Sequence, residues 1–231
     1  MLSKRFCFIC QVLAAALSIM FIMNAHAESA RPFRPVPKIT LEIDENRTVD
    51  LNGPINTISA GFFLEQFAYL DDGKPILIRI SSPGGSIADG LDIIKAIQAA
   101  KSPVTCLVDN YAASMAALIA AQCPKLVMHK YGLLMFHEYS TSIEGSRKQL
   151  KSRMDLIESL WEAIMQDLSE KSGIPRAELD ALVANDWWLN AQEAADYKFI
   201  NNIVDHYKVT KKNTDLFQEI LKFLKPSKEV Y

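Results

Sequence analysis

Two side chains of this chain have the types and settings that acyl-transfer chemistry requires, and the first is Ser114. It stands in NYAASMAALIAAQ, residues 110–122, shortly after the apolar run Val104 to Val108. The pattern predicts a buried strand followed by a buried helix, whose unpaired N–H groups and positive dipole end would stabilise negative charge at the serine. On position alone, a helix-capping serine is the simpler interpretation.

The second is His137, because a serine hydroxyl becomes an effective nucleophile only with a base in hydrogen-bond reach. His137 ends the apolar run Leu133 to Phe136, so a strand would present its imidazole at the rim of a sheet. His129 and His206 stand in settings typical of surface histidines, and His26 lies near the N-terminus. His137 is therefore the candidate general base, although a histidine at a strand end is more often structural.

The stretch Ser81 to Ser86, SSPGGS, places a Gly-Gly pair between a predicted strand and a predicted helix. Such a pair lets the backbone approach a ligand closely and turn N–H groups toward an anion. The lysine and serine of a Walker loop are missing from it, and the sequence has no HExxH motif and no Cys/His cluster at metal-ligand spacing. We therefore expect no cofactor and no catalytic metal.

Apolar runs of strand length alternate with amphipathic helical patterns from Ile39 onward. Strands alternating with helices imply right-handed crossovers and a mostly parallel sheet covered on both faces, so the fold class is α/β. A chain of 231 residues that is 49% hydrophobic can bury a sizeable core, and we expect one domain over residues 39–208. The predicted strands span residues 48–51, 76–80, 104–108, 126–128 and 133–136, and the predicted helices span residues 57–70, 86–99 and 112–121.

A longer helical pattern covers residues 146–172 and breaks this alternation. Its apolar residues recur at alternating spacings of four and three, as in a coiled-coil seam. They are Leu150, Met154, Ile157, Trp161, Ile164 and Leu168. Such a helix either crosses the surface of its own domain or projects to meet a second subunit.

Residues 1–27 have the three parts of a secretory signal peptide. Lys4 and Arg5 form a positive start, an almost wholly apolar stretch runs from Phe6 to Met23, and Ala25-His26-Ala27 fits a cleavage site. The pattern predicts a periplasmic or secreted protein. An anchor that stays uncleaved in the membrane is the alternative, because the apolar stretch is close to the roughly 20 residues that span a bilayer.

Two further segments flank the predicted domain. Residues 28–38 contain RPFRPVPK, whose prolines favour an extended linker. Residues 209–231 form a tail in which residues 214–224 have the pattern of an amphipathic helix that packs on the domain. Loss of Lys4 and Arg5 with the signal would move the formal net charge from −2 to −4, and a weakly acidic protein argues against a nucleic-acid partner.

The cysteines fall into two pairs. Cys7 and Cys10 would leave with the signal peptide, and Cys106 and Cys123 would remain. An even pair in an exported chain favours a disulfide, and a helix that runs back alongside the strand carrying Cys106 would bring Cys123 near. Two separately buried thiols are the alternative.

Four stretches stand in the order, and at close to the spacing, found in the proteolytic subunit of the Clp protease. They are ISSPGGSIADG, NYAASMAALIAA, LLMFHEYS and NDWWLNAQEAADY. The chain resembles that family from about Val49 to Asp205, and residues 146–172 resemble its handle helix. The resemblance implies a ClpP/crotonase-type fold of stacked βαβ repeats with a protruding handle helix, and a Ser-His-Asp peptidase site.

The resemblance assigns a role to five residues. Ser114 of AASM matches the nucleophile, His137 of MFHE the general base, and Asp186 of NDWWLNA the acid that orients the imidazole. Gly85 and Met115 match the two backbone N–H donors of the oxyanion hole.

Asp109 and Asp155 are rival acids in this scheme. Asp109 is too near Ser114 in the sequence to reach the far imidazole nitrogen easily, and Asp155 is expected to face solvent on the long helix. Asp186 is therefore favoured.

The chain departs from the family pattern at several positions. Asn110, Ala116 and Lys198 stand where the family usually has glycine, Glu138 and Tyr139 stand where it has glutamine and proline, and residues 141–145 offer one glycine where it has a Gly-rich strand. Because that strand lines the substrate in the family, its change bears on how an extended peptide would pair with the edge.

The resemblance implies a serine endopeptidase that hydrolyses peptides or unfolded segments through a Ser114 acyl-enzyme, as a homo-oligomer built through the handle helix. An exported form has no cytosolic ATP, so we expect ATP-independent activity without an ATPase partner. A catalytically silent binding or assembly module is one alternative, which the altered substrate strand motivates. A Ser-Lys peptidase resembling signal peptide peptidase A is another, for which Lys101 or Lys130 is available.

Overall fold

The computed structural model describes residues 35–140 and 143–210, and these residues form a mixed α/β fold. The predicted signal peptide, linker residues 28–34 and the tail from residue 211 lie outside the described residues. Among the helices of the described part, none combines the length and the apolar character needed to cross a bilayer.

The elements follow one another mainly as alternating strands and helices. The strands are β1 (Lys38–Asp44), β2 (Thr48–Asn52), β3 (Ile76–Ser82), β4 (Val104–Ala113), β5 (Leu126–His129), β6 (Leu133–Phe136), β7 (Trp187–Asn190) and β8 (Asn202–Thr210). The helices are the 3-10 turn η1 (Glu45–Arg47), α2 (Thr57–Leu70), α3 (Ile87–Gln98), α4 (Met115–Gln122), α5 (Arg147–Ser172), α6 (Arg176–Val183) and α7 (Ala191–Asp196).

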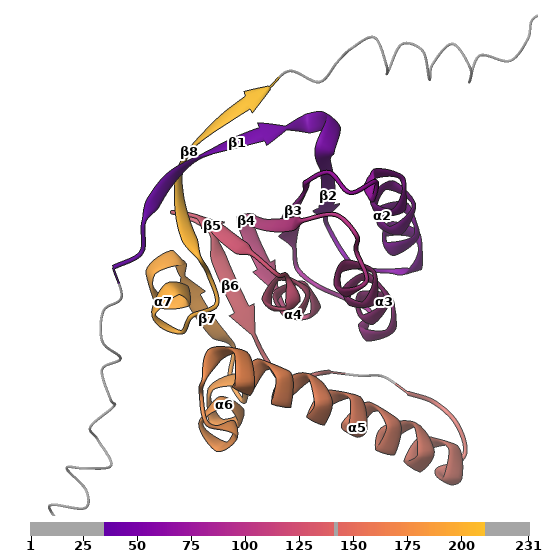
Figure 1. Cartoon of the computed structure of the whole chain (residues 1–231). Helices are drawn as coiled ribbons and strands as arrows, with labels where there is room; N and C mark the ends of the chain where they lie inside the picture. Colours follow the sequence, from indigo (N-terminus) through magenta and orange to yellow (C-terminus); the bar gives the residue numbers. More distant parts are fainter. Residues whose placement is uncertain (1–34, 141–142, 211–231) are drawn as a thin grey trace, which may run out of the picture. The chain divides into compact units, whose positions relative to one another are not determined.

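One mostly parallel sheet joins all of these strands. Its main path runs β1-β8-β5-β4-β3-β2, and β6 pairs with the end of β4 on one side and with β7 on the other. The pairs along the main path are parallel, and β6 with β7 is antiparallel. Figure 1 shows α5 as the longest helix, with its amino-terminal half reaching out beyond α3. The predicted α/β class and mostly parallel sheet are confirmed.

The two faces of the sheet are covered differently. Alternate residues of the central strands point to a large core packed with helices, as Cys106 and Val108 of β4 do. The residue between them, Leu107, belongs to a smaller cluster with Ile43, Val127 and Val204, to which strands alone contribute. Helices on both faces were expected. Instead the curl of the sheet brings β1 and β8 over its second face (Figure 1).

Local signals explain where the helices start and stop. Asn56 caps α2 in a capping box with Ser59, and α2 has the predicted bounds. Ser146 and Gln149 form the same motif at the start of α5, and α5 ends at Gly173, which has φ 69°. The side chain of Ser86 accepts a hydrogen bond from the third residue of α3.

Some bounds differ from those that the sequence predicted. The helix expected from residue 112 begins at Met115, because β4 continues to Ala113 and the positive φ of Ser114 separates the two elements. Lys38, assigned to the linker, is the first residue of β1, and residues 209–210, assigned to the tail, end β8. The sequence did not predict β1, β7, β8, α6 or α7.

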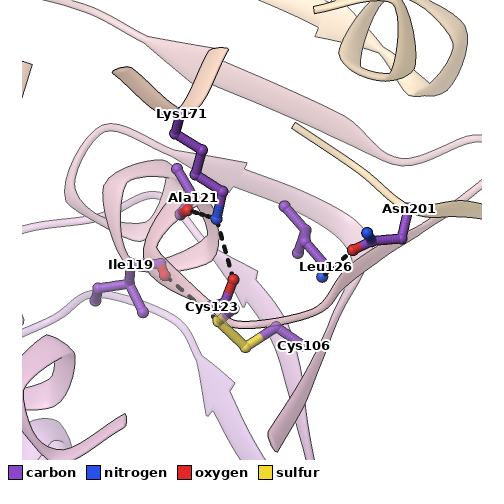
Figure 2. The surroundings of a disulfide bond; sticks show 7 residues. All are labelled: Cys106, Ile119, Ala121, Cys123, Leu126, Lys171 and Asn201. Atoms are coloured by element: carbon purple, nitrogen blue, oxygen red, sulfur yellow. Dashed lines mark hydrogen bonds between the residues drawn. A yellow bond between two sulfur atoms is a disulfide. The ribbon is translucent and has the colours of Figure 1, made fainter. Parts of the chain in front are cut away.

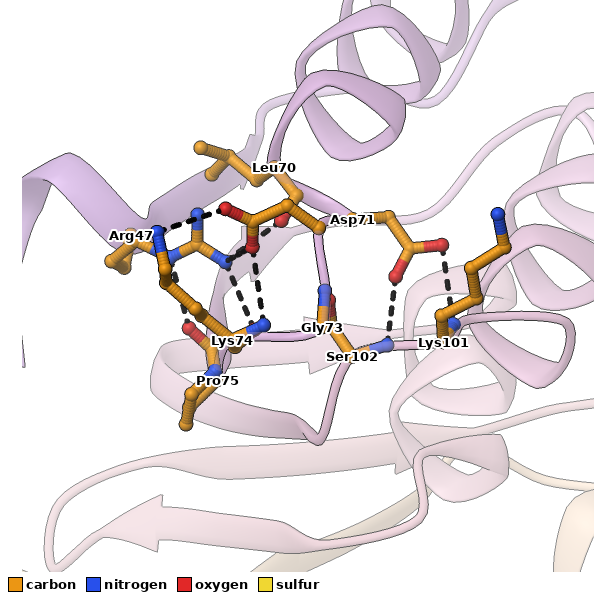
Figure 3. A network of polar contacts seen from close by, with 9 residues as sticks. Arg47, Leu70, Asp71, Gly73, Lys74, Pro75, Lys101 and Ser102 are labelled. Carbon is orange, nitrogen blue, oxygen red and sulfur yellow. Dashed lines mark hydrogen bonds and ion pairs between the residues drawn. The ribbon is translucent and has the colours of Figure 1, made fainter.

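Arg47 holds together the loops that precede β2 and β3. Its guanidinium pairs with the carboxylate of Asp72 at 2.9 Å. It also donates to three backbone carbonyl oxygens, those of Leu70 at 2.7 Å, Lys74 at 2.9 Å and Pro75 at 3.2 Å (Figure 3). One side chain thereby satisfies backbone acceptors that follow the end of α2.

Asp71 connects the same loop to the start of β4. Its carboxylate accepts hydrogen bonds from the N–H groups of Ser102 at 2.8 Å and Lys101 at 3.2 Å (Figure 3). The hydrogen bonds from Lys101 and Ser102 lower the pKa of Asp71. We call Arg47, Asp71 and Asp72 the amino-edge network, because β2, β3 and β4 all begin beside them.

Candidate active site

Ser114 occupies a strained junction between β4 and α4. Its backbone has φ 54° and ψ −127°, a conformation that side-chain-bearing residues rarely adopt. Strain of this kind costs about 1–3 kcal/mol and gathers at functional sites. Ser114 occupies the N-cap position of α4, but its hydroxyl makes no capping hydrogen bond, so the side chain does not have the capping role that its position alone favoured.

The Gly-Gly pair packs directly against this junction. A Cβ on Gly84, which has φ +88°, would lie 2.6 Å from the carbonyl oxygen of Ala113 and 2.9 Å from the Cβ of Ser114. A Cβ on Gly85, which has φ +148°, would lie 2.2 Å from the carbonyl oxygen of Ile55. Both positions therefore need glycine, and the loop can approach the serine closely.

A cavity of about 290 Å³ opens at this junction, and four of the predicted site residues line it: Ser114, His137, Gly85 and Met115. Within the described part of the chain, the N–H groups of Gly85 and Met115 donate no hydrogen bond, which leaves them available to an oxyanion. The rest of the wall is largely apolar, and it includes Ile87, Leu118, Met135, Trp161 and Ile164.

The pairing of β6 with β4 brings serine and histidine to one edge. Ala113 lies opposite Met135 in the parallel ladder, and the N–H of Ser114 donates to the carbonyl oxygen of Met135 at 2.8 Å. His137 follows two residues later, just past the end of β6. Ligand sites of open parallel sheets form at such carboxyl ends of strands.

Asp186 lies beside this site and outside the cavity wall. It directly precedes β7, and the antiparallel register that pairs Phe136 with Trp187 would, continued by one residue, set Asp186 opposite His137. Asp186 is exposed. Across residues 35–140 and 143–210, no hydrogen bond joins the side chains of Ser114, His137 and Asp186. Ser114 and His137 thus line one cavity, and the β6–β7 register, continued by one residue, would place Asp186 opposite His137 beside that cavity.

The rival acids have other partners. The carboxylate of Asp109 accepts a hydrogen bond from the hydroxyl of Tyr207, 2.5 Å away. Asp155 faces solvent on α5, as expected, and pairs with Lys151 at 3.0 Å. Neither carboxylate lines the cavity that holds Ser114.

The lysines and the remaining histidines also lie elsewhere. Lys130 pairs with Asp205 at 2.8 Å, and neither Lys130 nor Lys101 lines the cavity. His129 contacts the rings of two tyrosines, and His206 is 69% exposed and lies 3.1 Å from Asp205. Among the described residues, no group of three or more His, Cys, Asp or Glu side chains is arranged to hold a metal ion.

The far end of α4 is held by a disulfide and a lysine. Cys106 of β4 and Cys123, just after α4, are joined with a Cα–Cα distance of 6.1 Å, and both are buried. The ammonium of Lys171 on α5 donates to the carbonyl oxygens of Ala121 and Cys123 (Figure 2). Desolvation of this ammonium lowers the pKa of Lys171. The helix whose amino end follows Ser114 is thus fixed at its carboxyl end.

Several residues that line the cavity were not assigned to the site from the sequence. Trp161 was assigned with Ile157 and Ile164 to a coiled-coil seam, and all three instead line the cavity with Ser114. Tyr139 was noted only as a departure from the family pattern, and it also lines the cavity. The heptad spacing placed these side chains on one face of α5 correctly but could not say what that face covers.

Comparisons with known proteins agree with this geometry. The family model described as Clp protease matches residues 35–207. The chain is 28% identical over 196 residues to the ATP-dependent Clp protease proteolytic subunit 1 of Protochlamydia amoebophila (strain UWE25), covering 78% of this chain and 91% of that protein. It is 31% identical over 169 residues to the ATP-dependent Clp protease proteolytic subunit 3 of Parasynechococcus marenigrum (strain WH8102), covering 69% of this chain and 83% of that protein.

The family match over residues 35–207 includes nearly all of the curled parallel sheet, together with Ser114 and His137. The chain belongs to the Clp protease family. Membership supports peptidase activity in general.

Proposed function

We propose that this protein is an exported, ATP-independent serine endopeptidase that cleaves peptides or unfolded segments through a Ser114 acyl-enzyme. The observation that carries the proposal is the setting of Ser114: its backbone is strained, its hydroxyl makes no capping hydrogen bond, and it lies in one cavity with His137, Gly85 and Met115. Family membership supports the same reaction class.

The proposed mechanism assigns a role to each group. His137 takes the hydroxyl proton of Ser114 as the oxygen attacks the peptide carbonyl, and gives that proton to the departing amine as the acyl-enzyme forms. It then takes a proton from the water that attacks the ester and returns it to the Ser114 oxygen as the acid product leaves. The N–H groups of Gly85 and Met115 would bind the oxyanion, and the positive end of α4 adds to their effect. Asp186 would orient the imidazole once its carboxylate turns toward His137, which the β6–β7 register supports.

The cavity supports a substrate preference. Its walls are mainly apolar and it holds about 290 Å³, so we expect a large apolar side chain next to the cleaved bond.

Hydrolysis of a fluorogenic peptide library tests the proposal. Wild type should cleave after apolar residues, Ser114→Ala and His137→Ala should each lower kcat by about 10⁴-fold or more, and Lys130→Ala should keep full activity. Unchanged hydrolysis in His137→Ala would refute the histidine base, and a loss confined to Lys130→Ala would favour the Ser-Lys alternative.

Export rests on the N-terminal pattern of residues 1–27, and the disulfide between Cys106 and Cys123 supports it, because disulfides persist in oxidising compartments. ATP independence follows because an exported protein has no access to cytosolic ATP. The mass of the protein isolated from its host tests whether it is exported and cleaved. Loss of residues 1–27 is expected, and a full-length membrane-bound chain would favour the uncleaved anchor.

A homo-oligomer built through α5 belongs to the same proposal. The carboxyl half of the predicted seam is buried on its own domain at Ile164 and Leu168. In the amino half of α5, Met154 of the seam and Leu156 outside it are exposed at 37% and 61%. Leu156→Glu should therefore weaken assembly, measured as sedimentation at fixed concentration. An unchanged assembly would argue against α5, and a monomeric wild type against any oligomer.

One observation favours the second candidate, a silent binding or assembly module. Asp186 is exposed, and within the described ranges it makes no hydrogen bond to His137. A fully folded protein that binds unfolded peptide but neither cleaves it nor reacts with a fluorophosphonate would establish the module and exclude the peptidase.

A further inference from the structure

The segment that carries His137 is anchored to the helices beneath it at two points. The N–H of Glu138 donates to the carbonyl oxygen of Val183 at the end of α6, 2.9 Å away. The hydroxyl of Tyr139 donates to the carboxylate of Glu158 on α5, also at 2.9 Å. Among the described residues, Tyr139 supplies the one side-chain hydrogen bond made by residues 137–140.

The ring of Tyr139 forms a second contact with α5. It meets the ring of Trp161 edge-on, with centroids 5.5 Å apart and an interplanar angle of 63°. Edge-to-face pairs of this kind are attractive beyond the area they bury. Both rings line the cavity that holds Ser114 and His137, so the contact lies beside the reacting groups.

The contacts of Tyr139 are important because the imidazole of His137 has few contacts of its own that would fix its position. His137 lies just beyond β6, is partly exposed, and in residues 35–140 and 143–210 makes no hydrogen bond through its side chain. Its position relative to Ser114 therefore depends on the backbone of residues 137–139. A general base must lie within about 0.5 Å of its productive position.

We propose that Tyr139 is a positioning residue for His137: its hydrogen bond to Glu158 and its contact with Trp161 fix residues 137–139 on α5 and so set the distance from the imidazole to the Ser114 hydroxyl. This inference rests on the proposed function, since it concerns the same site. Proline, usual in the family here, has neither the hydroxyl nor the aromatic ring, so this chain holds its histidine by a different means.

The anchor persists over the pH range in which histidine acts. The hydrogen bond to Glu158 raises the pKa of Tyr139, so the phenol keeps its proton well above the ordinary histidine pKa of about 6.5. The donor of the bond is therefore present at neutral pH.

A double-mutant cycle tests the proposal. Tyr139→Phe and Glu158→Ala should each lower kcat about tenfold, with KM changed less than twofold, because a hydrogen bond to a charged group is lost and the cavity keeps its ring. The kcat of the double variant should be no lower than that of either single variant, because both substitutions remove the same interaction. Glu158→Gln, which keeps an acceptor oxygen, should recover most of the rate. Tyr131→Phe is the matched control, because Tyr131 is 77% exposed and away from the cavity.

A second measurement separates this proposal from the proposed function. Amide hydrogen exchange at Glu138 should be faster in Tyr139→Phe than in wild type, whether or not the protein hydrolyses peptides. Wild type that neither cleaves peptides nor reacts with a fluorophosphonate would end the peptidase proposal, and with it the role of Tyr139 in positioning a base. In an active wild type, an unchanged kcat or unchanged exchange in Tyr139→Phe, or additive effects in the cycle, would overturn the role of Tyr139 alone.

Discussion

The two edges of the parallel sheet differ in how their polar side chains are used. At the amino edge, the side chains of Arg47 and Asp71 make several hydrogen bonds to the backbone of the loops. At the carboxyl edge, the side chains of Ser114, His137 and Asp186 make no hydrogen bond to one another in the described part of the chain, and Ser114 has a strained backbone. The first edge is cross-linked by hydrogen bonds between loops, whereas within the described residues the second leaves the proposed catalytic side chains without hydrogen bonds to one another.

This difference shows how one fold can separate contacts that stabilise it from a candidate active site. Parallel strands all begin at one edge and all end at the other, so loops that stabilise and loops that act on substrate are separated by the length of a strand. Changes at the amino edge should alter stability without altering chemistry. Changes at the carboxyl edge should alter the chemistry, and where they remove backbone strain they should also raise stability.

The largest expected effect is at Ser114. Ser114→Gly should lower peptide hydrolysis by about 10⁴-fold or more and also raise the free energy of unfolding by about 1–2 kcal/mol, because glycine relieves the positive φ. Urea denaturation and a peptide assay on one preparation measure both. Ser114→Ala, which keeps the strain, is the control: it should lose the activity with stability changed by less than about 0.5 kcal/mol.

The disulfide should give the largest effect on stability alone. Replacing Cys106 and Cys123 together by alanine should lower the free energy of unfolding by about 3 kcal/mol, because the bond closes a loop between residues 17 positions apart. Chemical denaturation of the purified variant measures this. Wild type treated with a reductant that reaches the buried sulfurs should lose the same amount. A variant as stable as wild type would show that the bond does not constrain the chain.

Arg47→Met should lower the free energy of unfolding by about 2 kcal/mol, since the loop carbonyl oxygens that it satisfies would lose their donor. The kcat of the folded fraction should stay at the wild-type value, which peptide hydrolysis at a temperature well below the unfolding transition would show. A lowered kcat would show that a change at the amino edge affects the chemistry as well as the stability.

Acid should weaken the contacts that Asp71 makes at the amino edge. The pKa of Asp71 is lowered by hydrogen bonds from the N–H groups of Lys101 and Ser102, so the stability that its carboxylate adds is present above its unfolded pKa of about 3.9 and is lost as the pH falls through the lower folded value. Urea midpoints measured between pH 5 and pH 2 should therefore fall more steeply in wild type than in Asp71→Asn. Parallel curves would contradict the role given to this carboxylate.

The smallest effect is expected at Lys198, the other described non-glycine residue with positive φ, at 62°. The family usually has glycine there, and Lys198→Gly should raise the free energy of unfolding by about 1 kcal/mol. Unlike Ser114→Gly, it should leave hydrolysis unchanged. A loss of activity would mean that strain at this position also serves function.

Much of the site was predictable because its signals are local. Ser114 and His137 each follow an apolar run, and Gly84 and Gly85 follow another, so three strand ends with chemical groups were visible in the sequence. The bounds of α2 were predictable for the same reason, since Asn56 and Ser59 form its cap.

The rest depends on contacts between distant parts of the chain. β1 and β8 were missed because most of their residues are exposed or only partly buried, and because each strand pairs with the other across most of the sequence. The partnership of Tyr139 with Glu158 joins a loop to a helix face, which no periodicity reveals. The seam on α5 was seen, but whether its residues meet a second subunit or line a cavity is decided by tertiary packing.

The most direct test of the account is to locate the adduct that a fluorophosphonate probe leaves on the purified protein. Peptide mapping by mass spectrometry should find one adduct, on Ser114, with labelling slowed at least 100-fold in His137→Ala because the base is lost. An adduct on another serine, or equal labelling of wild type and His137→Ala, would contradict the claim that His137 activates Ser114.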